Sequence, residues 1–150
     1  MLQVSQKCQY GLRAVLELAA RAGTGPVSVS EIAAAQAIPP RFLELILNQL
    51  RKAGFVSSYR GVQGGYELAG PPGKLTVGVI IRQIDGPMAP VDCIADGGDA
   101  GCALYGHCAF MGMWRRAQRA VEVVYDGTTF QNLLDQQRAA QEFVVANYTI

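Results

Sequence analysis

Residues 39–70, "PPRFLELILNQLRKAGFVSSYRGVQGGYELAG", join an amphipathic segment to two short β-prone runs. Large apolar residues recur at helical spacing in the first part, at Leu43, Ile46, Leu47 and Leu50. The prolines suit the first turn of a helix, and Gly54 is placed to end it. Residues 55–59 and 66–68 then flank a glycine-rich tip, which predicts a β-hairpin. The stretch therefore predicts one helix followed by a hairpin.

Two further helices are predicted before this stretch. In "SQKCQYGLRAVLELAARAG", Ser5 is a suitable N-cap and Gly23 a suitable stop for an amphipathic helix. In "SVSEIAAAQAI", Ser28 or Ser30 can cap a short helix. The order helix, short helix, turn, helix and hairpin is that of a winged helix-turn-helix. We therefore expect a mainly α fold with a small β-hairpin wing.

The third helix and the hairpin tip carry the candidate DNA-binding residues. Arg41, Glu44 and Asn48 are spaced to share one exposed face, and their side-chain types can read guanine, cytosine and adenine edges. Arg60 and Gln63 lie in the tip, from which an arginine can enter a minor groove. The alternative is an ordinary solvent-facing helix, or a helix-turn-helix that binds protein. The complete set of elements in this order favours DNA binding.

The distribution of charge supports an anionic partner for the N-terminal half. The chain has 150 residues and a formal net charge of +1. Residues 1–70 contain seven Lys or Arg and four Glu, a net charge of +3, whereas the remainder has a net charge of −2. No apolar run reaches the ~20 uncharged residues that a bilayer needs, so we expect no signal peptide, no membrane segment and a cytoplasmic protein.

Three of the four cysteines lie in "CIADGGDAGCALYGHC", residues 93–108. Eight residues separate Cys93 from Cys102, and five separate Cys102 from Cys108. Thiolates on a flexible loop suit an iron–sulfur cluster or zinc, and in a reducing compartment disulfides are not expected. Free cysteine also fills cores as a small apolar residue. Three cysteines in one polar loop favour a ligand or redox role over core filling.

A candidate dimerisation helix follows the cysteines. In "MWRRAQRAVEVVYDG", four residues fall at near-heptad spacing before Gly127, namely Trp114, Ala117, Val121 and Val124. Such a seam can pack inside one chain or against a second copy. Because the winged unit is complete before it, we expect a homodimer interface. The domains expected are residues 1–85 for DNA binding, 86–112 for a cysteine-bearing sensor loop, and 113–150 for the long dimerisation helix and C-terminal helices.

Several segments resemble a known family from about Ser5 to Leu134. They are "LRKAGFVSSYRGVQGGYELA", "LTVGVIIRQIDG", the clustered cysteines and "MWRRAQRAVEVVYDGTTFQNLL". They are similar to the bacterial winged-helix repressors of the Rrf2 family, of the IscR and NsrR type. The resemblance implies a homodimer that binds a roughly two-fold operator in double-stranded DNA, often under control of an iron–sulfur cluster, 2Fe-2S or 4Fe-4S. By position it assigns Arg41 and Glu44 to the recognition helix and Arg60 to the wing.

The same resemblance implies that Cys93, Cys102 and Cys108 are cluster ligands. The histidine that follows the last cysteine in the iron–sulfur assembly regulators is replaced here by Met111. Two other residues are candidates for the fourth ligand. Cys8 lies in the first turn of a helix, where the helix dipole favours a thiolate that could reach across the dimer, but it could equally pack against the wing. His107 precedes Cys108 directly and is the less favoured candidate, because a lone histidine is more often a surface residue than a ligand.

Three classes of function follow from these features. The favoured class is a DNA-binding transcriptional regulator, expected to repress, that senses redox state, nitric oxide or iron through an iron–sulfur cluster. The alternative is a cluster-free winged-helix regulator controlled by thiol oxidation or by a protein partner. An enzyme is not expected, because the sequence has no phosphate-binding glycine motif before a helix and only one histidine.

Overall fold

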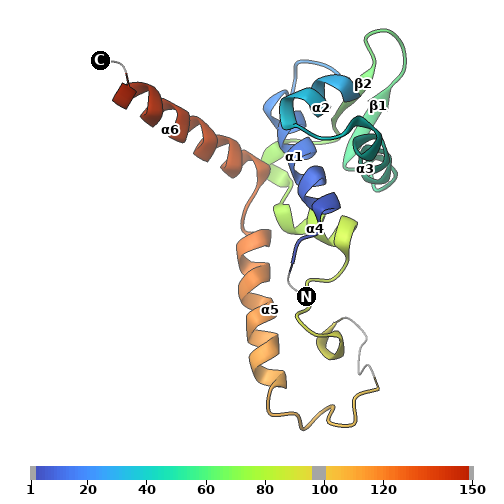
Figure 1. Ribbon diagram of the computed structural model, residues 1–150, viewed down its shortest axis with the longest axis vertical. Coiled ribbons are helices and arrows are strands. Elements are labelled where there is room, and N and C mark those ends of the chain that lie inside the picture. The colour runs from blue at the N-terminus through green and yellow to red at the C-terminus, as the bar shows by residue number, and fades with distance from the viewer. Residues whose placement is uncertain (1–2, 96–100, 149–150) are drawn as a thin grey trace.

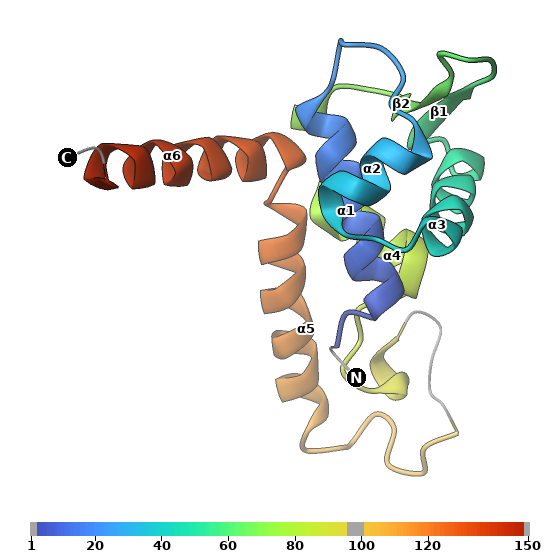
Figure 2. The same ribbon diagram turned by 45° about the horizontal axis from the view of Figure 1, so that its top comes forward.

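The computed structural model describes residues 3–95 and 101–148 and is mainly helical, with one two-stranded hairpin (Figure 1). Its helices and strands run in the order α1 (Gln6–Ala20), α2 (Val29–Gln36), α3 (Pro40–Lys52), β1 (Val56–Tyr59), β2 (Gly65–Leu68), α4 (Val77–Asp85), α5 (Met111–Asp126) and α6 (Phe130–Tyr148). The expected fold class is confirmed. Helices α1 to α4 and the hairpin form one body, from which α5 and α6 extend in different directions (Figures 1 and 2).

The predicted helix starts are formed by side-chain caps. The Oγ of Ser5 accepts a hydrogen bond from the backbone N–H of Cys8 at 3.1 Å. Ser28, and not Ser30, caps α2, because its Oγ accepts from the N–H of Glu31 at 3.2 Å while the Glu31 carboxylate accepts from the N–H of Ser28 at 3.0 Å. This reciprocal capping box satisfies two amide groups that the helix itself leaves unpaired.

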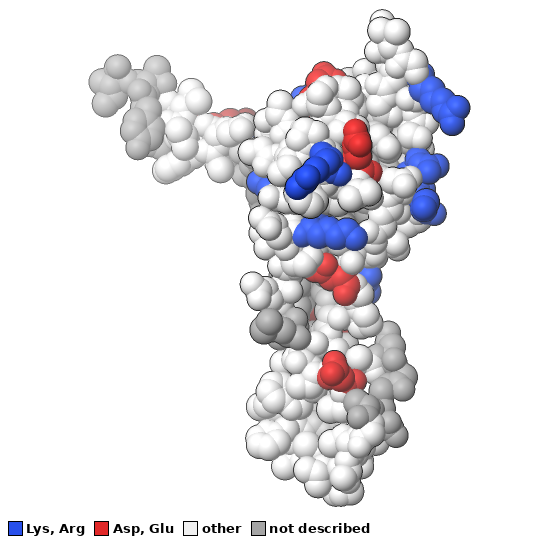
Figure 3. Space-filling model, turned by 45° about the vertical axis from the view of Figure 1, so that its right-hand side comes forward, with Lys and Arg blue, Asp and Glu red and all other residues white. Residues whose placement is uncertain are grey.

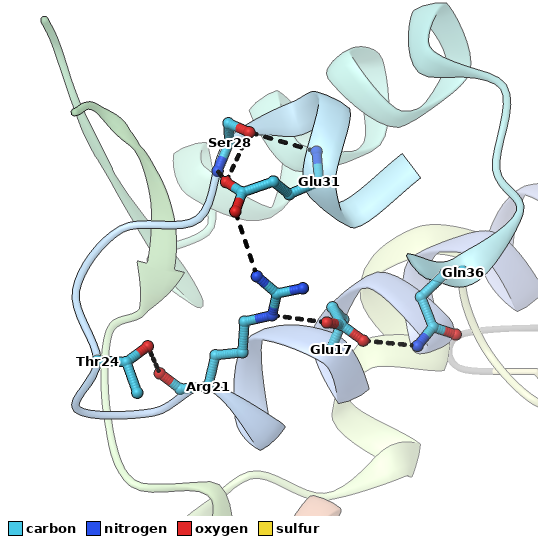
Figure 4. Close-up of polar contacts among 6 residues, drawn as sticks. All are labelled: Glu17, Arg21, Thr24, Ser28, Glu31 and Gln36. Atoms are coloured by element: carbon cyan, nitrogen blue, oxygen red, sulfur yellow. Dashed lines mark hydrogen bonds and ion pairs between the residues drawn. The ribbon is translucent and has the colours of Figure 1, made fainter. Parts of the chain in front are cut away.

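A polar network links the end of α1 to both ends of α2 (Figure 4). Arg21 contacts Glu17 at 2.7 Å and Glu31 at 3.4 Å. The other carboxylate oxygen of Glu17 accepts from the Gln36 amide at 2.8 Å. Hydrogen bonds from Ser28, and the charge of Arg21, lower the pKa of Glu31 below its ordinary value. The network therefore connects α1 and α2 at the surface, above their contacts in the core.

The main core lies among α1, α2, α3 and the start of α6. Its fully buried side chains include Leu18, Ile32, Leu43, Leu47 and Phe130. Two backbone hydrogen bonds hold α6 in place: the N–H of Val77 donates to Thr128 O at 2.9 Å, and the N–H of Phe130 donates to Leu75 O at 3.0 Å. The core of the winged domain therefore includes residues from the segment that follows α5.

The wing is an antiparallel pair in which Val56 faces Leu68 and Tyr59 faces Gly65. Tyr66 also exchanges two backbone hydrogen bonds of 2.8 Å with Val27, so the loop before α2 pairs with β2. A Cβ atom at Gly65 would overlap the carbonyl of Val27. The second glycine of the "GGY" motif is therefore required for this close backbone approach.

We predict that Gly65→Ala destabilises the winged domain by about 2 kcal/mol, because backbone atoms must move to admit the methyl group. Thermal unfolding followed by circular dichroism measures the effect. Gly70→Ala is the matched control, since a Cβ there meets nothing within 4 Å. Equal midpoints for the two variants would contradict the assigned role of Gly65.

Candidate DNA-binding face and cysteine loop

Helix α3 turns a polar face to solvent and an apolar face to the core. Arg41 and Glu44 are exposed, as the helical spacing predicted. Asn48 is only half-buried, and its Oδ1 accepts a hydrogen bond from the Arg51 guanidinium at 2.8 Å. The Oδ1 of Asn48 is therefore already engaged within α3, whereas Arg41 and Glu44 are exposed on the helix surface.

The wing tip carries Arg60 and Gln63 on its exposed side. Gly61 has a φ of +109° and its carbonyl accepts from the N–H of Gly64 at 3.0 Å, which closes the turn. At the base of the tip, a hydrogen bond to Glu67 and the charge of that carboxylate raise the pKa of Tyr59. The wing and α3 lie on the same side of the body in both ribbon views (Figures 1 and 2).

Positive charge accumulates on this side of the molecule. Four exposed cations belong to α3 and the wing, namely Arg41, Arg51, Lys52 and Arg60. In the space-filling view, Lys and Arg side chains are spread over the winged domain with a few acidic groups between them, and the lower part of that face also shows acidic groups (Figure 3). The exposed cations of α3 and the wing attract a polyanion such as DNA.

Sequence reasoning missed three exposed apolar side chains near this surface. Phe42 and Leu45 lie on α3, and Val62 lies at the wing tip, where it is fully exposed. Hydrophobic residues are ordinarily assigned to a core, so their identity alone gave no signal. Phe42 and Leu45 fall between the core-facing positions of α3, and Val62 falls inside a turn. These positions are what marks them as surface residues.

The three thiols of the cysteine loop do not lie together in one cluster. Cys93 lies in a short 3₁₀ turn, Asp92–Ile94, and is half-buried, Cys102 is exposed, and Cys108 is half-buried just before α5. Within residues 3–95 and 101–148, no three His, Cys, Asp or Glu side chains are close enough to hold a metal ion. His107 is exposed beside Cys108. The donor types suit an iron–sulfur cluster, but their present positions do not form a site.

Cys8 is in a different environment from the one the sequence suggested. Its side chain is completely buried and packs with Val77, Ile81 and Met88. Burial, with the nearby charge of Asp85, raises the pKa of the Cys8 thiol to about 12. Desolvation outweighs the helix dipole at this position, which favours the alternative that Cys8 packs as a core residue. Cys8 is a protonated core residue in this fold.

The predicted seam of α5 is divided between two environments. Trp114, Ala117 and Val121 are half-buried, and Val121 lines a pocket with Asp85 and Tyr125 of the same chain. Val124 is 61% exposed. Other exposed apolar side chains on α5 and α6 include Met113, Val123, Phe143, Val144 and Val145. Both helices thus present apolar surface that the described part of this chain does not cover.

Helix α5 is joined to α4 by a bidentate ion pair. Both terminal nitrogens of Arg82 contact the Asp126 carboxylate at 2.7 Å. These hydrogen bonds lower the pKa of Asp126. A Cβ at Gly78 would overlap Asp126, so the glycine allows the two helices to approach.

In the described parts of the chain, no helix is both long enough and apolar enough to cross a membrane.

Comparison with known proteins gives consistent results for fold and sequence. The family described as Rrf2, iron-dependent transcriptional regulator, matches residues 4–136. The HTH-type transcriptional regulator CymR of Bacillus subtilis is 37% identical over 141 residues, which cover 94% of this chain and 96% of CymR. The solved structure of that protein, described as the global cysteine regulator, superposes with a TM-score of 0.76 and 38% identity, over 91% of this chain and 98% of CymR.

A second solved structure, IscR of T. potens, superposes with a TM-score of 0.76 and 34% identity, over 93% of this chain and 90% of IscR. The relatives described here are regulators of transcription and not enzymes. The family match spans most of the chain, including the winged domain, the cysteine loop and α5. The chain therefore belongs to the Rrf2 family of winged-helix transcriptional regulators.

Proposed function

We propose that this regulator binds a two-fold DNA operator as a homodimer and senses its signal through the cysteine loop. The recognition helix α3 enters the major groove with Arg41 and Glu44, and the wing places Arg60, with Gln63 beside it, at the minor groove. The observation that carries this proposal is the joint exposure of these side chains on α3 and the wing of a family member. Asn48 takes a supporting part, because its amide holds Arg51.

The homodimer is supported by the uncovered apolar surface of α5 and α6. Val123 is 72% exposed and Val124 61% exposed, although both are large apolar residues on a long helix. A second copy related by a two-fold axis covers the same surface on both chains and places two α3 helices for two half-sites. We therefore assign α5, with Val124 among its contacts, to the dimer interface.

For the sensor we propose an iron–sulfur cluster held by Cys93, Cys102 and Cys108. The support is the donor chemistry: three free thiols in sixteen residues, none more than half-buried, in a chain that matches an iron-dependent family. Such a cluster, when bound, supplies iron that reacts with oxygen or nitric oxide. Binding requires the three thiols to come together from their present positions. His107 is better placed than buried Cys8 to complete the set, because it is exposed next to Cys108.

A second candidate is control by thiol oxidation or by a protein partner, without a cluster. It is favoured by the separation of the three thiols within the described residues. The likeness to CymR, described as a global cysteine regulator, is consistent with it. The two candidates differ in whether iron and sulfide are bound.

We predict that Arg60→Ala weakens binding to an operator selected by the unaltered protein by about 1–3 kcal/mol. The substitution removes both the contact that the Arg60 side chain makes in the minor groove and the attraction of its charge to the phosphates. Fluorescence anisotropy at several salt concentrations measures the change. Lys74→Ala removes an exposed charge outside α3 and the wing and should leave affinity nearly unaltered. Equal affinities for both variants would argue against the wing assignment.

We predict that Val124→Glu dissociates the dimer, because a two-fold contact would bring two carboxylates together without partners. Sedimentation velocity measures the oligomeric state. Val62→Glu places the same charge at the exposed wing tip and should leave the dimer intact. A Val124→Glu protein that sediments as a stable dimer would remove α5 from the interface.

We predict that single serine replacements of Cys93, Cys102 and Cys108 each abolish most iron and sulfide binding after anaerobic reconstitution. The control is Cys8→Ser, which should keep its iron because the Cys8 thiol is buried and protonated. Metal analysis and the visible spectrum give the readout. Full iron in the Cys102 or Cys108 variant would contradict the ligand set, and a colourless unaltered protein with reactive thiols would support the second candidate.

A further inference from the structure

Helix α3 exposes two large apolar side chains on the side opposite the core. Leu45 is 67% exposed and Phe42 is 45% exposed. The side chains that α3 buries are Leu43, Ile46, Leu47 and Leu50. Leu45 follows Phe42 by three positions and Arg41 by four, so the three side chains share one stripe of the helix surface. Packing among the residues that the structure describes does not account for this apolar stripe.

Within the stripe, Leu45 is the apolar group that a ligand can reach most readily. The Arg41 guanidinium lies 5.0 Å from the centre of the Phe42 ring, a cation–π arrangement that covers part of the ring. This contact also holds the Arg41 side chain along the helix. Leu45, one turn further on, keeps about two-thirds of its surface open to solvent.

The charges around Leu45 restrict what it can contact. Four exposed cations lie on α3 and the wing, against one exposed carboxylate of α3, Glu44. A partner that uses these cations and also covers Leu45 is an anion that presents an apolar group. In the major groove of DNA, the C5 methyl of thymine is the apolar group among the base edges. An apolar protein surface would leave the four cations unpaired, whereas DNA pairs its phosphates with the cations and offers the thymine methyl to Leu45.

We propose that Leu45 contacts a thymine methyl group in each half-site and so selects thymine at that position. The inference rests on the proposed function of α3 as the recognition helix. Leucine has no hydrogen-bonding group in its side chain, so it cannot read the O4 or N7 atoms and discriminates only by removing the methyl from water. Removing that methyl should weaken binding about fourfold per half-site, and about fifteenfold for a two-fold operator.

The test uses the full-length protein and an operator selected from random duplex DNA. Each thymine of the operator is replaced in turn by deoxyuridine, which keeps the base pair and removes only the methyl. Anisotropy titrations at fixed salt compare the unaltered protein with Leu45→Ala. We expect one uracil position per half-site to weaken binding by the unaltered protein about fourfold, and the same replacement to have no effect on Leu45→Ala.

Three outcomes would overturn the inference. An operator that tolerates uracil at every thymine contradicts it and leaves the proposed function standing. A uracil effect of the same size in Leu45→Ala shows that another residue contacts the methyl. A selection that enriches no sequence contradicts the proposed function itself, and this inference with it.

Discussion

Helix α1 is the surface on which the other elements of the winged domain are assembled. Its residues Ala14, Val15 and Leu18 are at most 1% exposed, and it contacts α2, α3, α4, α6 and β2. A Cβ at Gly11 would overlap the Ile84 side chain, so α4 approaches α1 as closely as a glycine allows. Because α3 and the wing both pack against this one helix, their relative position is fixed by buried apolar contacts. The polar face of α3 is then free to serve binding.

The features that the sequence predicted are those determined by neighbouring residues. Ser5 and Ser28 cap their helices through hydrogen bonds to residues three positions away, and the apolar period of α3 places Leu43 and Leu47 in the core. A cap and a helical period are both readable in a few consecutive residues. The same holds for the wing, since its two runs and its glycine tip are contiguous in the chain.

The features that the sequence did not predict depend on residues far apart in the chain. Phe130 enters the winged core from beyond α5, and Gly65 meets the backbone of Val27. The pKa of Cys8 depends on distant residues in the same way. Its position in the first turn of a helix favours a thiolate, whereas its burial beside Met88 raises the pKa of the thiol and keeps it protonated. Which contacts surround a residue decides its pKa, and the sequence near Cys8 does not contain them. The ligand positions in the cysteine loop depend on tertiary structure in the same way.

Helix α5 is attached to the winged domain less firmly than the winged domain is held together. None of its described side chains is fully buried, and its ion pairs with α4 join Arg82, 37% exposed, to Asp126 and Glu122, 43% and 29% exposed. An exposed pair of this kind contributes only about 0–1 kcal/mol. The cysteine loop meets a different environment at each end, because Met88 is buried beside Cys8 while Cys108 leads directly into α5.

We therefore expect a change in the loop to move α5 before it disturbs the core around α1, since the weaker attachment yields first. With α5 as the proposed dimer helix, a shift of this kind alters the separation of the two α3 helices. A two-fold operator has fixed half-site spacing, so this separation determines how well both helices fit the DNA at once. The proposed link from cysteine chemistry to DNA affinity thus needs no rearrangement inside the winged domain.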